Sequence, residues 1–299
     1  MKKFENKNCF ITGAASGIGR SFALALAKKG MNLFITDINM ENLENVRQEI
    51  ENLGTNVYTG KCDVSKFEDF EKMAKEFYSK LGNVDLLINN AGIAIGGDLI
   101  ELELKDWKEV LDVNLWSVIY SIKTFLPSML ERGSGHIVNV ASGAGIFGST
   151  EPLPYIASKF AVVGISEGLF GQLYNQGIQV SVIIPSYVKT NIFSVSKMKY
   201  SKKFVEELGE EKLDAIFRDR AQKMLHNAIL PDKAVGKYIE GIKNNQLYIF
   251  DKRNILPIFI LKGKDPQQFE KFLINYYDNY IKTTKEFFLK FGINIDDYK

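Results

Sequence analysis

Short apolar runs alternate with amphipathic helical patterns along most of this chain, and no other feature constrains its fold as strongly. Units of strand, helix and strand place successive strands parallel in one sheet, with the helices on its faces. The expected strands cover Asn8–Thr12, Met31–Asp37, Asn56–Asp63, Leu86–Asn89, Ile137–Val140, Val180–Ile184 and Leu247–Phe250. Right-handed crossovers between seven such strands predict an α/β fold with a doubly wound, mostly parallel sheet, the Rossmann fold.

The pattern predicts one Rossmann-type domain over residues 1–250, because no repeat or interdomain linker interrupts it. Long helical segments are expected near 105–131 and 155–175. Two regions fall outside the alternation. Residues 191–230 are charged and helical in pattern, and residues 251–299 form a C-terminal extension rich in Phe and Tyr.

Composition excludes several classes of protein. The 299 residues are 45 % hydrophobic and 25 % charged, as in ordinary globular domains. Lys and Arg number 38 and Asp and Glu 36, so no basic excess points to nucleic acid. Cys9 and Cys62 lie in strand-like runs and are expected to be buried thiols. His136 and His226 have no Cys or carboxylate at ligand spacing, so we expect no metal site.

Neither a signal peptide nor a membrane-spanning segment is expected. The N-terminus, MKKFENKNCFITG, lacks the apolar core of a signal peptide. The longest strongly apolar stretch, Ile255–Leu261, has seven residues and contains Pro257, whereas a spanning helix needs about 20. We therefore expect a cytoplasmic protein.

The turn after the first expected strand reads TGAASGIGR and has the features of a phosphate-binding turn. Gly13 lets the chain turn tightly, Gly17 keeps a side chain away from a pyrophosphate, and Gly19 lets the helix pack close to the sheet. Ser16 and Ile18 lie in the same turn, where the helix N-terminus offers N–H groups to phosphates. The alternative is an ordinary strand-to-helix turn.

Asp37 ends the second expected strand, 18 residues after Gly19. A carboxylate at this position can accept both ribose hydroxyls of adenosine and repels a 2′-phosphate. Ile38, Ala15 and Ser16 offer no positive charge to neutralise such a phosphate, so the sequence favours NAD over NADP. Alternatively, Asp37 caps the helix that follows.

Tyr155 and Lys159 stand four residues apart, which places both on one face of a helix. A tyrosine hydroxyl titrates near pH 10 in water, and a nearby cation favours the phenolate and lowers its pKa. The pair therefore suits proton transfer. Taken alone, such a pair also fits a solvated helix face.

With these motifs, the chain resembles the short-chain dehydrogenase/reductase family over about residues 5–250. The glycine-rich turn and the Tyr155–Lys159 pair match family motifs, and Ser142 stands thirteen residues before Tyr155, as the family's catalytic Ser does. Other residues that match in family order are Asp63, Val64, Asn90, Ala91, Gly92, Asn114, Pro185, Val188 and Thr190. Ser186 departs from the pattern, which usually has Gly there.

The resemblance implies a role for each catalytic residue. Tyr155 would be the general acid/base. Lys159 would lower the pKa of Tyr155 and form a hydrogen bond with the nicotinamide ribose. Ser142 would stabilise the charge developing on the substrate oxygen, and Asn114 would hold a water that relays protons. The implied cofactor contacts are Gly13, Ser16, Gly17, Ile18, Gly19, Asp37, Asp63, Val64, Asn90, Ala91, Gly92, Tyr155, Lys159, Pro185, Val188 and Thr190.

Three loops beyond the strand ends are expected to line the substrate pocket: Ile93–Gly97, Gly143–Tyr155 and Ser186–Phe193. Their only charges are Glu151 and Lys189, so they favour an apolar secondary alcohol or ketone. The apolar side chains expected there are Ile93, Ile95, Ile146, Phe147, Leu153, Tyr187, Ile192 and Phe193.

The two outlying regions keep alternatives open. By resemblance, residues 191–230 cover the substrate, either as a mobile cover or as a helix packed permanently on the core. The extension has aromatic residues at helical spacing. It could pack over its own core or pocket, form a subunit contact, or lie on a membrane surface.

The sequence therefore predicts an NAD-dependent oxidoreductase that interconverts an apolar secondary alcohol and its ketone, or an aldehyde. A non-catalytic NAD(H)-binding regulator or scaffold is the main alternative, and an epimerase or dehydratase of the same fold is another. The family resemblance implies a homodimer or homotetramer formed through the helices that carry Asn114 and Tyr155.

Overall fold

A single parallel sheet forms the middle layer of the computed structural model, which describes residues 3–192, 196–252 and 255–298. Its strands are β1 (Asn8–Thr12), β2 (Asn32–Asp37), β3 (Val57–Lys61), β4 (Leu86–Asn89), β6 (Gly135–Val140), β7 (Ile178–Ile184) and β9 (Tyr248–Phe250). The order β3-β2-β1-β4-β6-β7-β9, with every pair parallel, confirms the predicted Rossmann fold. The strand order reverses between β1 and β4, where such folds bind their ligands.

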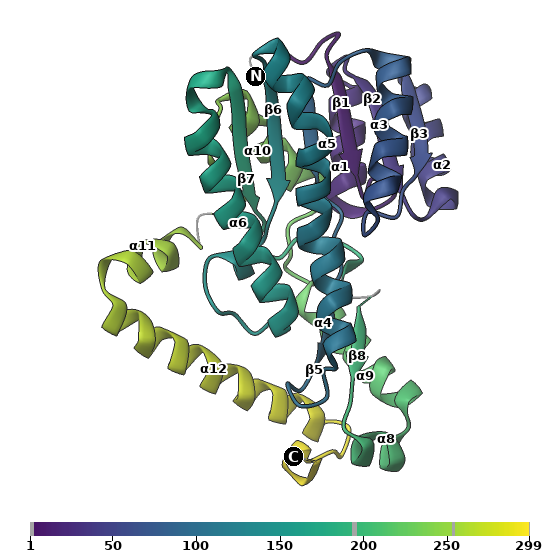
Figure 1. Cartoon of the computed structure of the whole chain (residues 1–299). Coiled ribbons are helices and arrows are strands. Elements are labelled where there is room, and N and C mark those ends of the chain that lie inside the picture. Colours follow the sequence, from purple (N-terminus) through teal and green to yellow (C-terminus); the bar gives the residue numbers. More distant parts are fainter. Residues whose placement is uncertain (1–2, 193–195, 253–254, 299) are drawn as a thin grey trace.

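Helices cover both faces of this sheet (Figure 1). One face packs against α1 (Gly17–Ala27), α2 (Met40–Glu51) and α10 (Pro231–Lys243). The other packs against α3 (Phe67–Leu81), α5 (Ser117–Arg132) and α6 (Leu153–Leu173). In β1, Cys9 and Ile11 belong to the first core and Phe10 to the second, because side chains alternate along a strand.

The helix expected near 105–131 is one continuous run with an irregular middle. It comprises α4 (Leu104–Leu111), a π-helical turn (Asp112–Trp116) and α5. Such π turns are rare and occur often at functional sites. The pattern of apolar residues does not reveal this turn, because it is only five residues long within one helical run. Short 3₁₀ turns lie at Gly143–Gly145, Tyr174–Gln176 and Ile295–Tyr298.

Residues 191–230 are only partly helical, so the prediction for this region is partly wrong. They contain α8 (Lys202–Leu208) and α9 (Glu210–Met224), but also β8 (Lys197–Lys199). β8 pairs in parallel with β5 (Ile95–Gly97) as a second, two-stranded sheet. Neither IGG in β5 nor KMK in β8 is an apolar run, so the sequence gives no signal for these two strands and only the tertiary structure reveals them.

The C-terminal extension forms α11 (Leu256–Lys264) and the long helix α12 (Pro266–Leu289). In Figure 1, α12 crosses below the end of α6 and ends beside α8 and α9. Phe147 contacts Phe272 and Tyr276 of α12, and Phe204 of α8 contacts Phe288. Among the described helices, none is long and apolar enough to cross a membrane.

Candidate active site

The glycine-rich turn has the backbone shape that the motif predicts. Gly13 and Gly17 both have positive φ, at 65° and 52°. A Cβ on Gly13 would lie 2.8 Å from the Cα of Ala91, so only glycine fits there. Ser16 precedes α1 with extended backbone and makes no side-chain cap. The first N–H groups of α1 therefore have no side-chain cap at the end of the helix where phosphates bind.

Asp37 is hydrogen-bonded to the glycine-rich turn. Its Oδ2 accepts a hydrogen bond from the backbone N–H of Ala15 at 3.0 Å, and its Oδ1 accepts one from Asn39 at 2.9 Å. The N-cap of α2 is Asn39, whose side chain accepts from the N–H of Asn42. Asp37 therefore joins the end of β2 to the glycine-rich turn, with its carboxylate lining the cavity.

Asn90 also supports the turn. Its Nδ2 donates to the carbonyl oxygens of Thr12 and Gly13, both at 3.0 Å. The Oγ1 of Thr12 accepts in return from the N–H groups of Asn90 and Ala91. Gly19 lies below this network, since its Cβ would lie 2.1 Å from the oxygen of Gly13. Its place is therefore the helix packing that the sequence predicts rather than the cavity wall.

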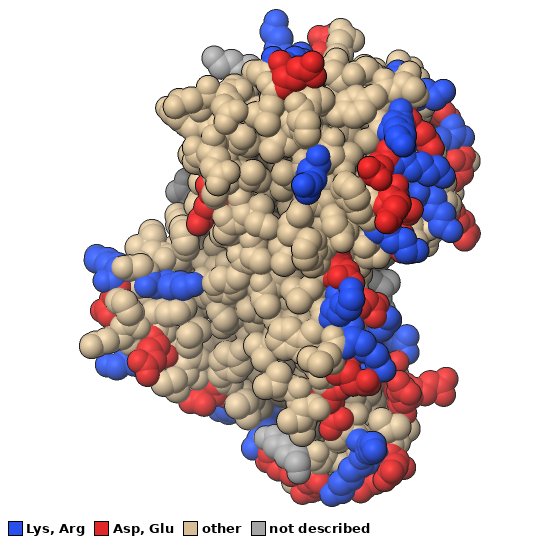
Figure 2. Space-filling view, in the orientation of Figure 1, with Lys and Arg blue, Asp and Glu red and all other residues tan. Residues whose placement is uncertain are grey.

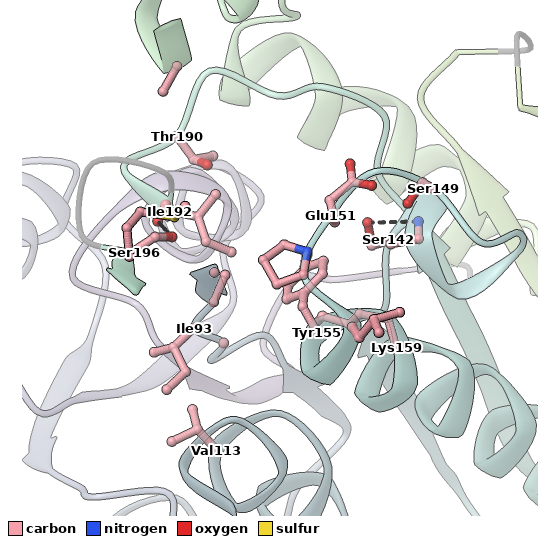
Figure 3. A pocket seen from close by; sticks show the side chains of 18 of the residues that line it. Ile93, Val113, Ser142, Ser149, Glu151, Tyr155, Lys159, Thr190, Ile192 and Ser196 are labelled. Carbon is pink, nitrogen blue, oxygen red and sulfur yellow. Dashed lines mark hydrogen bonds between the residues drawn. The ribbon is translucent and has the colours of Figure 1, made fainter. Parts of the chain in front are cut away.

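Helix α6 brings Tyr155 and Lys159 beside Ser142, which follows β6 (Figure 3). The Nζ of Lys159 donates to the carbonyl oxygen of Val140 at 3.0 Å and lies 5.5 Å from the centre of the Tyr155 ring. The Oγ of Ser142 accepts from the N–H of Ala144 at 3.1 Å. The hydroxyl proton of Ser142 is therefore free to point elsewhere.

Burial shifts the pKa of both titrating groups toward their neutral forms. It raises the pKa of Tyr155 to about 12, with the negative charge of Glu151 adding to the rise and a hydrogen bond with Ser142 opposing it. Burial lowers the pKa of Lys159 to about 8. Desolvation of the phenol outweighs the hydrogen bond with Ser142, so the pKa of Tyr155 is raised, and the role of Lys159 in lowering it stays a prediction.

Asn114 lies in the π-helical turn, fully buried, and does not line the cavity. Its side chain accepts from the N–H of Ile93 at 2.8 Å and donates to the carbonyl of Ile93 and to Ser158. A Cβ on Gly92 would lie 3.4 Å from the Oδ1 of Asn114 and 3.5 Å from the Nζ of Lys159. The two side chains therefore face a common space at Gly92, but the relay role stays a prediction.

Ser186 stands where the family usually has glycine, and its φ is not positive. Its N–H lies 3.1 Å from both carboxylate oxygens of Asp251, at the end of β9. Asp251 is only 2 % exposed and also accepts from the hydroxyl of Tyr238 at 3.0 Å. Sequence reasoning missed Asp251, whose only signal is a carboxylate directly after the last strand.

One cavity of about 1480 Å³ joins these groups. It is larger than the roughly 300–1,000 Å³ of usual ligand pockets, as a dinucleotide and a substrate together require. The predicted residues that line it are Gly13, Ser16, Gly17, Ile18, Asp37, Asp63, Val64, Asn90, Ala91, Gly92, Ser142, Tyr155, Lys159, Pro185, Val188 and Thr190. The uncapped α1 turn and the carboxylate of Asp37 at one end fit a dinucleotide.

The expected substrate wall needs correction. Ile93, Phe147, Leu153, Tyr187 and Ile192 do line the cavity. The others expected there differ: Ile95 and Ile146 are buried outside the lining, Lys189 does not line it, and Phe193 lies outside the described residues. Across the described part of the chain, no group of three or more His, Cys, Asp or Glu residues could hold a metal.

Both outlying regions also line this cavity. The residues of the C-terminal extension that do so are Ile255, Ile258, Tyr276, Tyr277, Tyr280, Thr284, Phe288, Ile295 and Tyr298. Those of β8, α8 and α9 include Met198, Tyr200, Phe204, Phe217, Arg220 and Met224. The helical spacing of aromatic residues signalled an apolar face, but not which surface it covers.

Comparison with known proteins agrees with this geometry. The family model described as short chain dehydrogenase matches residues 7–200, well over half of the chain. The chain belongs to the short-chain dehydrogenase/reductase family. As a member of that family, it is an oxidoreductase that acts on alcohols or ketones with NAD or NADP.

Among curated relatives, a cyclohexanol dehydrogenase of Acinetobacter sp. is 38 % identical over 194 residues, 64 % of this chain and 77 % of that protein. An estradiol 17-beta-dehydrogenase 11 of Macaca fascicularis is 30 % identical over 262 residues, 87 % of this chain and 79 % of that protein. The second alignment therefore includes much of the sequence beyond residue 200.

Solved structures show the same fold. A short-chain dehydrogenase/reductase of Burkholderia phymatum in complex with NAD has a TM-score of 0.79 and 31 % identity, covering 90 % of this chain and 96 % of that one. A metagenomic short-chain oxidoreductase in complex with NADP has a TM-score of 0.59 and 29 % identity, covering 61 % and 83 %.

Proposed function

We propose that this enzyme interconverts an apolar secondary alcohol and its ketone, with NAD as the cofactor and Tyr155 as the general acid/base. The observation that carries the proposal is that Ser142, Tyr155 and Lys159 lie on the same cavity as the glycine-rich turn and Asp37. A nicotinamide dinucleotide bound there would supply or accept the hydride.

The residues of this chain would handle the oxygen and its proton. With its pKa near 12, the hydroxyl of Tyr155 is protonated at neutral pH and can give its proton to the oxygen of a ketone being reduced. Ser142 would donate a hydrogen bond to the same oxygen as negative charge develops. In alcohol oxidation, the hydroxyl proton of the alcohol would pass to the oxygen of Tyr155.

Lys159 would restore the proton of Tyr155. Because its pKa is about 8, its ammonium and amine forms are both available near neutral pH. The space that Lys159 shares with Asn114 at Gly92 would provide the route toward solvent.

The preference for NAD is proposed from charge at the adenosine end. Asp37 places a carboxylate on the cavity there, and Ile38 beside it is 61 % exposed. Neither the glycine-rich turn from Gly13 to Ile18 nor the segment 37–42 contains Lys or Arg. A 2′-phosphate would therefore meet a negative charge without a cation.

The first test is a thermal-shift titration with NADH and NADPH, followed by assays on a panel of alcohols and ketones. At about 100 times its dissociation constant, the preferred cofactor should stabilise the fold by about 2.7 kcal/mol. We expect this shift with NADH and a smaller one with NADPH. Equal or larger stabilisation by NADPH would contradict the NAD assignment.

Tyr155→Phe tests the catalytic assignment. It should bind NADH as the wild type does and lose at least about 100-fold in kcat, the usual contribution of a general acid/base. Wild-type turnover by this variant would remove Tyr155 from its role. NADH binding without turnover of any substrate by the wild type would instead favour a non-catalytic protein.

A further inference from the structure

A carboxylate without a complete set of partners lies at the substrate end of the cavity. Glu151 lines the cavity two residues before α6 begins. Its Oε2 is buried and has no hydrogen-bond partner among the residues that the structure describes. Its Oε1 has only a long contact, 3.4 Å, from the hydroxyl of Tyr187.

No cation of the described chain forms an ion pair with Glu151. Glu151 is absent from all ion pairs found in residues 3–192, 196–252 and 255–298. Lys189, the opposite charge that the sequence placed on this wall, does not line the cavity. A buried carboxylate oxygen without a donor is costly, so its presence in a cavity needs an explanation.

The neighbouring phenols are mostly engaged with other groups. Tyr277 donates its hydroxyl to the carbonyl of Ser149. Burial raises the pKa of Tyr187 and of the neighbouring Tyr276, and the charge of Glu151 adds to both rises. These hydroxyls and the carboxylate form a small polar site. Oε2 can still accept a hydrogen bond.

This polar site lies near the reacting groups. In Figure 3, Glu151 lies on the same side of the cavity as Ser142 and Tyr155, opposite Ile93 and Ile192. The charge of Glu151 also reaches the Tyr155 hydroxyl, whose pKa it helps to raise. A substrate with its carbonyl at Tyr155 can therefore extend toward Glu151, with apolar side chains along the opposite wall.

Building on the proposed function, we propose that Glu151 determines substrate specificity: its carboxylate, on the wall of the cavity, accepts a hydrogen bond from a donor group on the substrate, remote from the reacting carbon. The substrate class is then a mainly apolar ketone or alcohol that carries a second hydroxyl or an ammonium group. Such a donor would supply the partner that the chain itself does not, and an analogue without the donor would leave the carboxylate unsatisfied.

The test compares matched ketones that differ only in the remote group. Cyclohexanone, 4-hydroxycyclohexanone and 4-aminocyclohexanone form one set, and a longer methyl ketone with the same three terminal groups forms a second. We expect wild-type kcat/KM with NADH to be at least about tenfold higher for a donor-bearing member than for the plain ketone, since hydrogen bonds to charged groups are strong.

Two substitutions separate charge from hydrogen bonding. Glu151→Met keeps a similar length without an acceptor oxygen and should abolish the preference for either donor. Glu151→Gln keeps an acceptor and should retain a preference for the hydroxyl but lose that for the ammonium. Glu71→Gln, an exposed change on α3, should leave all ratios unchanged. Unaltered NADH binding and thermal stability would show that the variants are folded.

Two outcomes would overturn the inference: wild-type enzyme that shows no preference within both sets, or a preference that survives in Glu151→Met. In either case reduction of the ketones would still support the proposed oxidoreductase activity. If the wild type binds NADH but reduces no ketone in any assay, the proposed function fails first, and the inference fails with it.

Discussion

At the scale of single residues, the site is governed by burial of charge. Tyr155 and Lys159 are both inside the protein, so each favours its neutral form: the phenol of Tyr155 and, above about pH 8, the amine of Lys159. Glu151 strengthens the effect on Tyr155 because a second negative charge nearby disfavours the phenolate.

This arrangement predicts the pH dependence of the two directions. Alcohol oxidation needs deprotonated Tyr155 and should rise with pH, whereas ketone reduction needs the protonated form and should fall at high pH. Glu151→Gln removes a charge that raises the pKa of Tyr155. The rise in oxidation and the fall in reduction, which are the two limbs of the pH profiles, should therefore both move to lower pH. Profiles of kcat/KM should use a substrate without a second donor group. Unmoved limbs would contradict the coupling of Glu151 to Tyr155.

A matched pair of variants tests Asp37. Asp37→Asn removes the charge but keeps an oxygen that can accept from Ala15, so the NADPH-to-NADH preference should rise about tenfold with little change in Tm. Asp37→Ala should show a similar change in preference and also a lower Tm, because it loses the hydrogen bond that holds the turn. Direct binding titrations give the ratio, and an unchanged ratio in both variants would refute the ribose assignment.

At the scale of elements, irregular segments position the catalytic groups. The π-helical turn between α4 and α5 lets Asn114 reach the backbone of Ile93 in the loop after β4. Asn114→Ala leaves these buried groups without partners and should lower the free energy of unfolding by about 1–3 kcal/mol. Urea denaturation measures this change. Wild-type stability together with reduced turnover would instead assign Asn114 a purely chemical role.

Helix α12 forms part of the substrate end through aromatic contacts. Phe272→Ala removes a ring that contacts Phe147 and should loosen α12 over the cavity. We expect the substrate KM to rise several-fold, with the dissociation constant of NADH unchanged because the cofactor end is remote. Ile274→Ala, on the same helix but with 54 % of Ile274 exposed, is the matched control. Equal effects of both changes would argue against a specific contact.

At the scale of the whole molecule, charge is unevenly distributed. Figure 2 shows acidic and basic side chains toward the edges and a broad region with few charges over the face formed by α5 and α6 in Figure 1. Trp116 and Leu130 of this helical run are 45 % and 38 % exposed. We predict that the contact of the expected homodimer or homotetramer lies on this face, because it has few charges and exposes large apolar side chains.

Trp116→Glu tests that expectation. Light scattering coupled to size-exclusion chromatography should give a multiple of 33.8 kDa for the wild type and a smaller assembly for the variant. Leu53→Glu, at an exposed position after α2, should keep the wild-type size. A monomeric wild type would contradict the prediction of a homo-oligomer.

The sequence alone determined the parallel sheet, the glycine-rich turn and the order of the motifs, because these depend on local patterns: strand and helix periodicity, glycine conformation and spacing along the chain. The places of Gly13, Asp37, Ser142, Tyr155 and Lys159 on one cavity follow from that order, since the carboxyl ends of parallel strands meet at one edge. The catalytic roles of Ser142, Tyr155 and Lys159 stay predictions.

Tertiary structure alone decided features that depend on contacts between distant segments. Three such features are the pairing of β5 with β8, the position of α12 over the cavity, and the hydrogen bond from Ser186 to Asp251. Each joins residues far apart in the sequence, and periodicity does not encode such contacts. The same holds for the pKa of Tyr155: the motif shows a nearby cation, but only the packed chain reveals the burial that raises this pKa.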